Sequence, residues 1–330
     1  MKFLRRDAAK TAGILLGGTL LAGVTSYFVT KFLVSTAMDR KGPKVLEKVG
    51  SLISGTMQSE GIIKAQKEAS EKLLSTEMET VSILSHDGID LVGHWYPCDR
   101  PERIVIAMHG WRSSWTNDFG LVADFMHDNR CGVLFVEQRG QNESGGDYIG
   151  FGITERFDCL DWIDWVINTV SDELPIYLCG VSMGATTVLM AGGLELPENV
   201  HGIIADCGFT SPDEIWRHIA NDNLHISYRF RRQLLRNLFD KHNRISGFDY
   251  STIEALRECV TPVLFIHGTD DHFVPVEMTY RNYCACAAPK RLLVVPGADH
   301  GMSYPMDTEG YQNVVRNFWK EFDGGAPEKS

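Results

Sequence analysis

The chain has 330 residues, of which 44% are hydrophobic and 23% are charged. These proportions are typical of a folded globular protein and exclude wholesale disorder. The formal net charge of −11 at pH 7 argues against nucleic acid as a partner.

The N-terminal segment contains twenty consecutive residues without a charge, from Thr11 to Thr30. A helix of that length spans about 30 Å, the thickness of a bilayer's hydrocarbon core. Basic residues precede this segment, which by the positive-inside rule keeps the N-terminus in the cytoplasm. They are Lys2, Arg5, Arg6 and Lys10. We therefore predict a single-pass transmembrane anchor over residues 1–37 in the cell membrane, with the rest of the chain on the extracytoplasmic side.

Two other interpretations of this segment stay open. Ser35-Thr36-Ala37 offers the small residues of a cleavage site, and the pair Arg5-Arg6 is similar to part of a twin-arginine signal. Cleavage there would give a secreted protein. The third interpretation is a buried helix. Basic residues after the segment, such as Arg40 and Lys41, also weaken the prediction of its orientation.

Residues 38–80 are polar, with apolar residues at helical spacing such as Leu46, Val49 and Ile53. This pattern predicts a helical stalk or linker that leads into the main domain. A helix packed on that domain's own surface fits the pattern equally well.

From residue 81 to about residue 325, short apolar runs alternate with amphipathic stretches. The runs are rich in Val, Ile and Leu and predict strands: Val81–Leu84, Ile89–Trp95, Ile104–Met108, Val133–Glu137, Ile176–Cys179, Ile203–Ala205, Val263–Ile266 and Leu292–Val295. The stretches between them predict helices: Asn117–Asp128, Thr154–Val170, Met183–Leu194, Val276–Ala287 and Thr308–Phe322. Such alternation predicts an α/β fold, with a mostly parallel central sheet covered by helices on both faces.

The alternation stops between Asp206 and Val260, where the sequence is helical and polar without a convincing strand. We interpret residues 209–255 or so as an insertion that forms a helical lid over one end of the sheet. Its segment Tyr228–Arg236 is basic. A solvated helix face explains these charges, and contact with anionic lipid headgroups is the alternative hypothesis.

The pentapeptide Gly180-Val181-Ser182-Met183-Gly184 follows one predicted strand and opens the next predicted helix. A nucleophilic serine on such a sharp turn needs glycines around it, because side chains there would collide. The turn lifts the Ser182 hydroxyl clear of the sheet. It also leaves the Met183 amide at a helix N-terminus, where it can donate to a developing oxyanion.

A serine nucleophile needs a base and a carboxylate that orients the base. His300 follows the last predicted strand, and Asp271 follows the strand before it. The order Ser182, Asp271, His300 is the one expected when three successive loops converge at one sheet edge. Asp206 and Asp270 are the rival carboxylates.

With these motifs the sequence resembles the α/β-hydrolase family over roughly residues 81–322, and in particular its membrane-anchored peptidase- and esterase-like branch. The resemblance selects Asp271 over Asp270 by its spacing from His267 and from Val274-Pro275. It also implies that Met108-His109-Gly110-Trp111 is the second oxyanion loop, with the Trp111 amide as donor. The family's Asp-x-Arg-Gly motif is similar to Glu137-Gln138-Arg139-Gly140, where Glu replaces the more usual Asp.

Together these features predict a serine hydrolase of acyl compounds, most simply a carboxylic ester hydrolase, which needs no metal or organic cofactor. A serine peptidase and an acyltransferase use the same triad and stay open as alternatives. A catalytically inactive binding protein is a more remote one. Phe209 and Tyr304 follow loops near the site and are candidates for lining a pocket for a small-molecule or lipid-like acyl substrate. Glu214 or Asp213 would serve a peptidase as anchor for a peptide's ammonium group.

Overall fold

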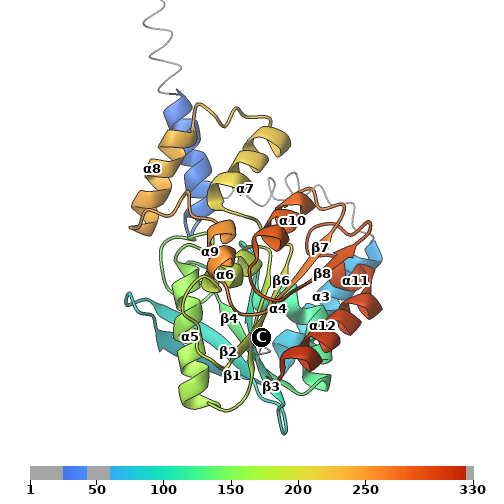
Figure 1. Cartoon of the computed structure of the whole chain (residues 1–330). Coiled ribbons are helices and arrows are strands. Elements are labelled where there is room, and N and C mark those ends of the chain that lie inside the picture. Colours follow the sequence, from blue (N-terminus) through green and yellow to red (C-terminus); the bar gives the residue numbers. More distant parts are fainter. Residues whose placement is uncertain (1–24, 43–59, 325–330) are drawn as a thin grey trace, which may run out of the picture.

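The computed structural model describes residues 25–42 and 60–324. Its centre is one eight-stranded sheet in the order β1-β2-β4-β3-β5-β6-β7-β8 (Figure 1). The strands are β1 (Glu79–Leu84), β2 (Asp90–Tyr96), β3 (Arg103–Met108), β4 (Cys131–Glu137), β5 (Ile176–Val181), β6 (Val200–Asp206), β7 (Val263–Gly268) and β8 (Lys290–Val295). β2 is antiparallel to both β1 and β4, and the strands from β4 to β8 are parallel.

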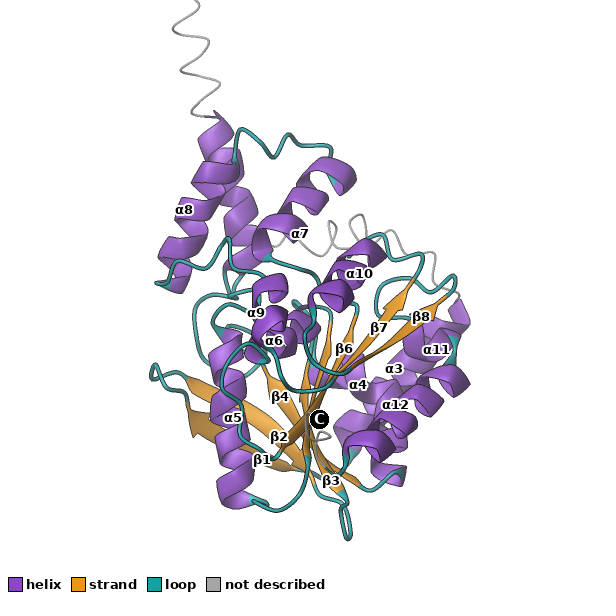
Figure 2. Cartoon of the chain, viewed as in Figure 1, coloured by secondary structure: helices purple, strands orange, loops and turns teal. Residues whose placement is uncertain are grey.

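Helices cover both faces of the sheet (Figure 2). One face carries α5 (Glu155–Thr169), α6 (Met183–Ala191), α9 (Thr252–Glu258) and α10 (Val276–Ala285). The other carries α3 (Glu60–Ser75), α4 (Trp115–Asp128), α11 (Ser303–Met306) and α12 (Thr308–Phe322). Every residue of β3 and of β4 is buried, because both sides of these strands face helices.

The predicted α/β fold is confirmed, and the predicted strands and helices differ from the observed ones mainly at their ends. β6 begins three residues before the predicted Ile203, and α6 ends at Ala191 instead of Leu194. Gly192 and Gly193 end α6, because glycine is a poor helix former.

The helix α3 packs along α4 instead of projecting from the domain. A Cβ atom on Gly120 of α4 would lie 2.8 Å from the backbone nitrogen of Ser70, so the absence of a side chain there allows the two helices to touch. Leu73 of α3 is buried in the same apolar cluster as Phe119 of α4. Of the two interpretations of residues 38–80, packing on the domain's surface therefore holds for α3, while residues 43–59 lie outside the described part.

The segment between β6 and β7 carries α7 (Pro212–His218), the π-helical turn η1 (Ile219–Asn223), α8 (Arg232–Asn243) and α9. In Figure 1, α7 and α8 stand beyond the end of the sheet at which β5 leads into α6. The predicted basic face of this insertion is partly neutralised. Arg232 pairs with Asp213 and Asp249, at 2.8 and 2.6 Å, and Arg236 pairs with Asp249 at 2.8 Å.

Residues 25–38 form a helix that lies against α7 and α8 (Figure 1). Its Val34 and Met38 are buried in one apolar cluster with Trp216 of α7 and Leu235 of α8. In the part of the chain that the structure describes, no helix has both the length and the apolar character needed to cross a bilayer. Most of the predicted anchor, residues 1–24, lies outside the described residues.

Candidate active site

Ser182 lies on the sharp turn between β5 and α6, with backbone angles φ 55° and ψ −115°. A left-handed φ is costly for a residue with a side chain, so the surroundings must hold it in place. Ser182 donates its backbone N–H to the carbonyl oxygen of Asp206 at 2.8 Å. A Cβ on Gly180 would overlap the backbone of Gly184, and one on Gly184 would overlap the Met108 carbonyl oxygen. Neither position therefore has room for a side chain.

His300, which follows β8, lies between Ser182 and Asp271. Its Nε2 is 2.9 Å from Ser182 Oγ, and its Nδ1 is 2.7 Å from Asp271 Oδ2. With the serine hydroxyl donating to Nε2, the Nδ1–H donates to the carboxylate. The structure thus brings the three predicted residues together in one hydrogen-bonded chain.

The carboxylate of Asp271 is buried but well supplied with donors. Its Oδ1 accepts hydrogen bonds from the backbone N–H groups of Phe273 and Val274, at 2.9 and 2.8 Å. The buried His267 places its Nε2 3.0 Å from Oδ2. Burial alone would raise the pKa of Asp271, but the charge of His300 and the hydrogen bond from His267 outweigh it, so the pKa lies well below its usual value. Asp271 therefore stays ionised at neutral pH.

The contact between Asp271 and His300 also shifts the pKa of His300. Burial disfavours the imidazolium, but the charge of Asp271 outweighs this and raises the pKa of His300 above its usual value. Asp271 thus stabilises the charge that His300 gains when it takes a proton.

The two rival carboxylates have other partners. Asp206 accepts a hydrogen bond from Ser303 Oγ at 3.0 Å, and its burial raises its pKa to about 6. Asp270 is exposed and accepts from Thr269 Oγ1 at 2.8 Å. Neither makes a hydrogen bond with His300 within residues 25–42 and 60–324.

The two predicted oxyanion donors belong to two separate segments that adjoin Ser182, the start of α6 and the loop after β3. The N–H of Met183 is the first of α6 and has no acceptor within the helix. The Trp111 loop is fixed on both sides of its amide: Gly110 donates its N–H to Asp118 at 2.6 Å, and Arg112 donates its N–H to Gln141 at 2.5 Å. A Cβ on Gly110 would come within 3.2 Å of Ser182 Cβ, so this loop lies directly against the nucleophile.

The Trp111 loop also contacts the helix of residues 25–38, which sequence reasoning did not connect with the site. Trp111 Nε1 donates to the carbonyl oxygen of Ala37 at 2.8 Å. The Arg112 guanidinium donates to the carbonyl oxygens of Thr36 and Asp39, at 3.0 and 2.5 Å. No signal in the sequence links these two segments.

Ser182 opens onto two cavities. The larger, about 360 Å³, is lined by His300, Asp118 and Tyr304 among others. The smaller, about 130 Å³, includes Phe209 in its lining. Both residues singled out as candidates for substrate binding therefore lie at the site, in different cavities.

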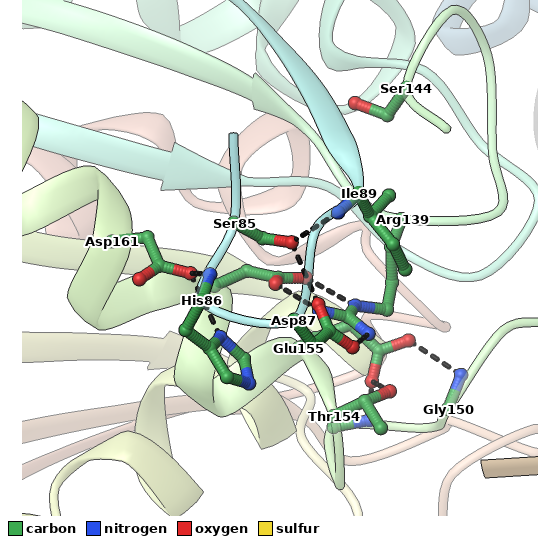
Figure 3. A network of polar contacts seen from close by, with 12 residues as sticks. Ser85, His86, Asp87, Ile89, Arg139, Ser144, Gly150, Thr154, Glu155 and Asp161 are labelled. Atoms are coloured by element: carbon green, nitrogen blue, oxygen red, sulfur yellow. Dashed lines mark hydrogen bonds and ion pairs between the residues drawn. The ribbon is translucent and has the colours of Figure 1, made fainter. Parts of the chain in front are cut away.

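Arg139, two residues after β4, makes structural contacts with Asp87 in the turn between β1 and β2 (Figure 3). The Arg139 guanidinium donates to Asp87 at 2.9 and 3.0 Å and to Asp158 of α5 at 2.6 Å. The hydrogen bond from Arg139 lowers the pKa of Asp87 to about 2. Glu137, in the position where Asp is more usual, lies 2.9 Å from His94 Nε2 and accepts the Glu143 N–H at 2.5 Å. These contacts join the hairpin of β1 and β2 to β4 and α5.

A metal ion has one candidate position near the triad, where ligand atoms of Cys207, Asp271 and His300 lie within 4.8 Å of one another. Asp271 and His300 already bond to each other there. Burial raises the pKa of the Cys207 thiol to about 11, so it stays protonated and is a poor ligand. The donor set therefore fits a triad better than a metal.

The chain is similar to several known proteins. Residues 104–316 match the family model described as "Alpha/beta hydrolase family". An uncharacterized Bacillus subtilis protein, YqkD, is 28% identical over 300 residues, which are 83% of this chain and 96% of that protein. The structure of the Pyrococcus furiosus esterase Pf2001 aligns with a TM-score of 0.60 at 25% identity, over 77% of this chain and 95% of the esterase. A puromycin-hydrolyzing peptidase of Mycobacterium tuberculosis aligns at 16% identity with a TM-score of 0.59, over 77% of this chain and 40% of the peptidase.

Proposed function

Since the chain belongs to the alpha/beta hydrolase family, we propose that it is a serine hydrolase that cleaves carboxylic esters. The observation that carries the proposal is the hydrogen-bonded chain from Ser182 through His300 to Asp271, whose serine end opens onto both cavities. Triads are recognised by this geometry and by the role of each member.

The mechanism begins when Ser182 Oγ attacks the ester carbonyl carbon while His300 Nε2 takes the hydroxyl proton. The carbonyl oxygen becomes an oxyanion that accepts hydrogen bonds from the Met183 and Trp111 amides. As the tetrahedral intermediate collapses, the carbon–oxygen bond to the alcohol breaks, and His300 gives its proton to the leaving oxygen. A water molecule, deprotonated by the same histidine, then attacks the acyl-enzyme, and the carboxylic acid leaves as Ser182 regains its proton.

Peptide cleavage is the second candidate, because one of the similar structures is a peptidase. The two carboxylates that sequence reasoning offered for a peptide's ammonium group are both occupied. Glu214 pairs with Arg217 and Arg281, at 2.6 and 3.1 Å. Asp213 pairs with Arg232 and also accepts a hydrogen bond from Tyr228 Oη at 2.5 Å. This favours esters over peptides with a free N-terminus.

The test is labelling of the full-length protein, in mild detergent, with a fluorophosphonate probe. We expect labelling in the parent protein and none in Ser182→Ala. A panel of acyl esters and aminoacyl amides then decides between the two candidates, with faster hydrolysis of esters expected. A folded parent protein that neither takes up the probe nor hydrolyses any substrate would contradict the proposal.

We also propose that the chain is a single-pass membrane protein whose catalytic domain lies on the extracytoplasmic side. The support is the uncharged segment Thr11–Thr30, together with exposed aromatic side chains just after residue 24: Tyr27, Phe28 and Phe32 are 44%, 62% and 47% exposed. The insertion between β6 and β7 would then lie close to the bilayer as a lid. Cell fractionation tests the anchor, and the mass of the mature N-terminus distinguishes it from a cleaved signal. Recovery of an uncleaved chain in the soluble fraction would contradict both the anchor and the cleaved signal.

A further inference from the structure

The two cavities at Ser182 differ in their chemistry. The larger one has polar and charged side chains in its wall, among them Asp118, His300 and Gln66. Among the described residues that line the smaller one, the only hydroxyl groups belong to Thr36 and Ser182, and none of these residues carries a charge. An ester bound at Ser182 has two halves, so each cavity can hold one of them.

The position of His300 decides which half goes where. In the proposed reaction His300 must protonate the leaving oxygen, so the alcohol half has to lie on the side of the histidine. His300 lines the larger cavity and is absent from the wall of the smaller one. The acyl half therefore extends into the smaller, apolar cavity.

The wall of this apolar cavity comes from two parts of the chain that are far apart in sequence. Leu33 and Ala37 come from the helix of residues 25–38, while Ile215 of α7 and Leu235 of α8 come from the insertion. The helix is held in place by burial of Val34 and Met38 among the insertion's aromatic residues. The carbonyl groups of Thr36 and Ala37 on this helix also accept hydrogen bonds from the Trp111 loop.

We propose that the helix of residues 25–38 is one wall of the acyl-binding site, and that this site takes an uncharged hydrocarbon acyl chain longer than acetyl. This inference rests on the proposed ester hydrolysis. Burying a hydrocarbon chain in the cavity is favourable in proportion to its apolar surface, whereas a terminal carboxylate there would lose its hydration without gaining a partner.

The experiment compares 4-nitrophenyl esters of acetate, hexanoate and decanoate, and the mono-ester of adipate, which matches hexanoate in length but ends in a carboxylate. The full-length protein in detergent is expected to prefer hexanoate to acetate, and hexanoate to the adipate ester, by about tenfold in kcat/KM. Leu33→Trp fills the cavity and should lower the hexanoate-to-acetate ratio by about tenfold. Leu33→Ala enlarges it and should raise the decanoate-to-hexanoate ratio. Phe28→Trp, on the exposed side of the same helix, is the matched control and should keep the wild-type ratios.

Leu33→Trp should move the preference toward shorter acyl chains and Leu33→Ala toward longer ones, and general destabilisation cannot produce both changes. If Leu33→Trp does not fold, Leu33→Ala still tests the inference. Wild-type ratios in folded Leu33 variants, or equal rates on the hexanoate and adipate esters, would overturn the inference while leaving the hydrolase proposal intact. Failure of the hydrolase proposal looks different, because wild-type protein would then neither react with a fluorophosphonate nor hydrolyse any of the esters.

Discussion

The indole of Trp111 donates its Nε1–H to the carbonyl oxygen of Ala37 at 2.8 Å. The backbone amide of the same tryptophan is one of the two proposed oxyanion donors, while Ala37 belongs to the helix of residues 25–38. A segment that the sequence alone assigns to a membrane anchor thus touches a residue whose amide serves the proposed chemistry.

Removing the indole N–H with Trp111→Phe should lower kcat by about tenfold, because the loop that presents the Trp111 amide loses its bond to Ala37. The Trp111 side chain acts here as a positioning group, so the thermal midpoint should change little. Steady-state kinetics on a short ester and a melting curve measure the two effects. Trp165→Phe, which packs against a different apolar cluster, is the control. An unchanged kcat would mean that the bond to Ala37 is dispensable.

A chain that starts at Thr25 should keep its activity, whereas one that starts at Gly42 or later should lose it. The N-terminal segment contacts the site through residues 32–39. The longer deletion removes one wall of the apolar cavity and bares the side chains that Val34 and Met38 cover. Fluorophosphonate labelling and thermal midpoints of both proteins check this. Equal labelling of the two truncated chains would be the contrary result.

The pH dependence of kcat/KM should show one acidic limb set by His300, because only the neutral imidazole can accept the serine proton. Asp271 raises the pKa of His300, so activity rises with pH through this raised value. Asp271→Asn removes the negative charge, which should move the limb to lower pH and reduce the plateau by about 10⁴-fold. Asp206→Asn is the matched substitution and should cost much less. A larger loss in Asp206→Asn would transfer the role of the acid to that residue.

Substituting Gly184 by Ala should prevent normal folding or destabilise the protein by roughly 3 kcal/mol or more, because the new Cβ would overlap the Met108 carbonyl oxygen. The nearby atoms are backbone and cannot move aside cheaply. Gly324→Ala is the control, since nothing lies within 4 Å of a Cβ built there. Denaturant unfolding followed by circular dichroism measures the difference. A Gly184→Ala protein as stable as the control would show that the turn relaxes more easily than this packing indicates.

The central sheet and the proximity of the three candidate side chains could be predicted from sequence because both leave local signals. Each strand is a short apolar run, and Ser182, Asp271 and His300 each follow such a run within a few residues. Parallel strands place those loops at one edge, so the order along the chain already brings the three side chains together.

The helix of residues 25–38 could not be placed in the same way. Its apolar residues suit a bilayer and a protein core equally well, and the residues that bury Val34 lie in a distant insertion without strand periodicity. The ion pair between Asp213 and Arg232 could not be predicted from sequence either, because a run of basic residues does not indicate which acidic residues will pair with it. Contacts between side chains far apart in sequence depend on the tertiary structure, which local patterns do not record.

The docking of this helix also imposes an order on folding during synthesis. Val34 leaves the ribosome about 200 residues before Leu235, with which it shares an apolar cluster. At a synthesis rate of roughly 5–20 residues per second, the helix waits at least about ten seconds for the helices that bury it. During that interval its apolar side chains need another cover, which a chaperone or a lipid surface can supply. The proposed acyl site is therefore completed late in synthesis, when the helix of residues 25–38 packs against α7 and α8.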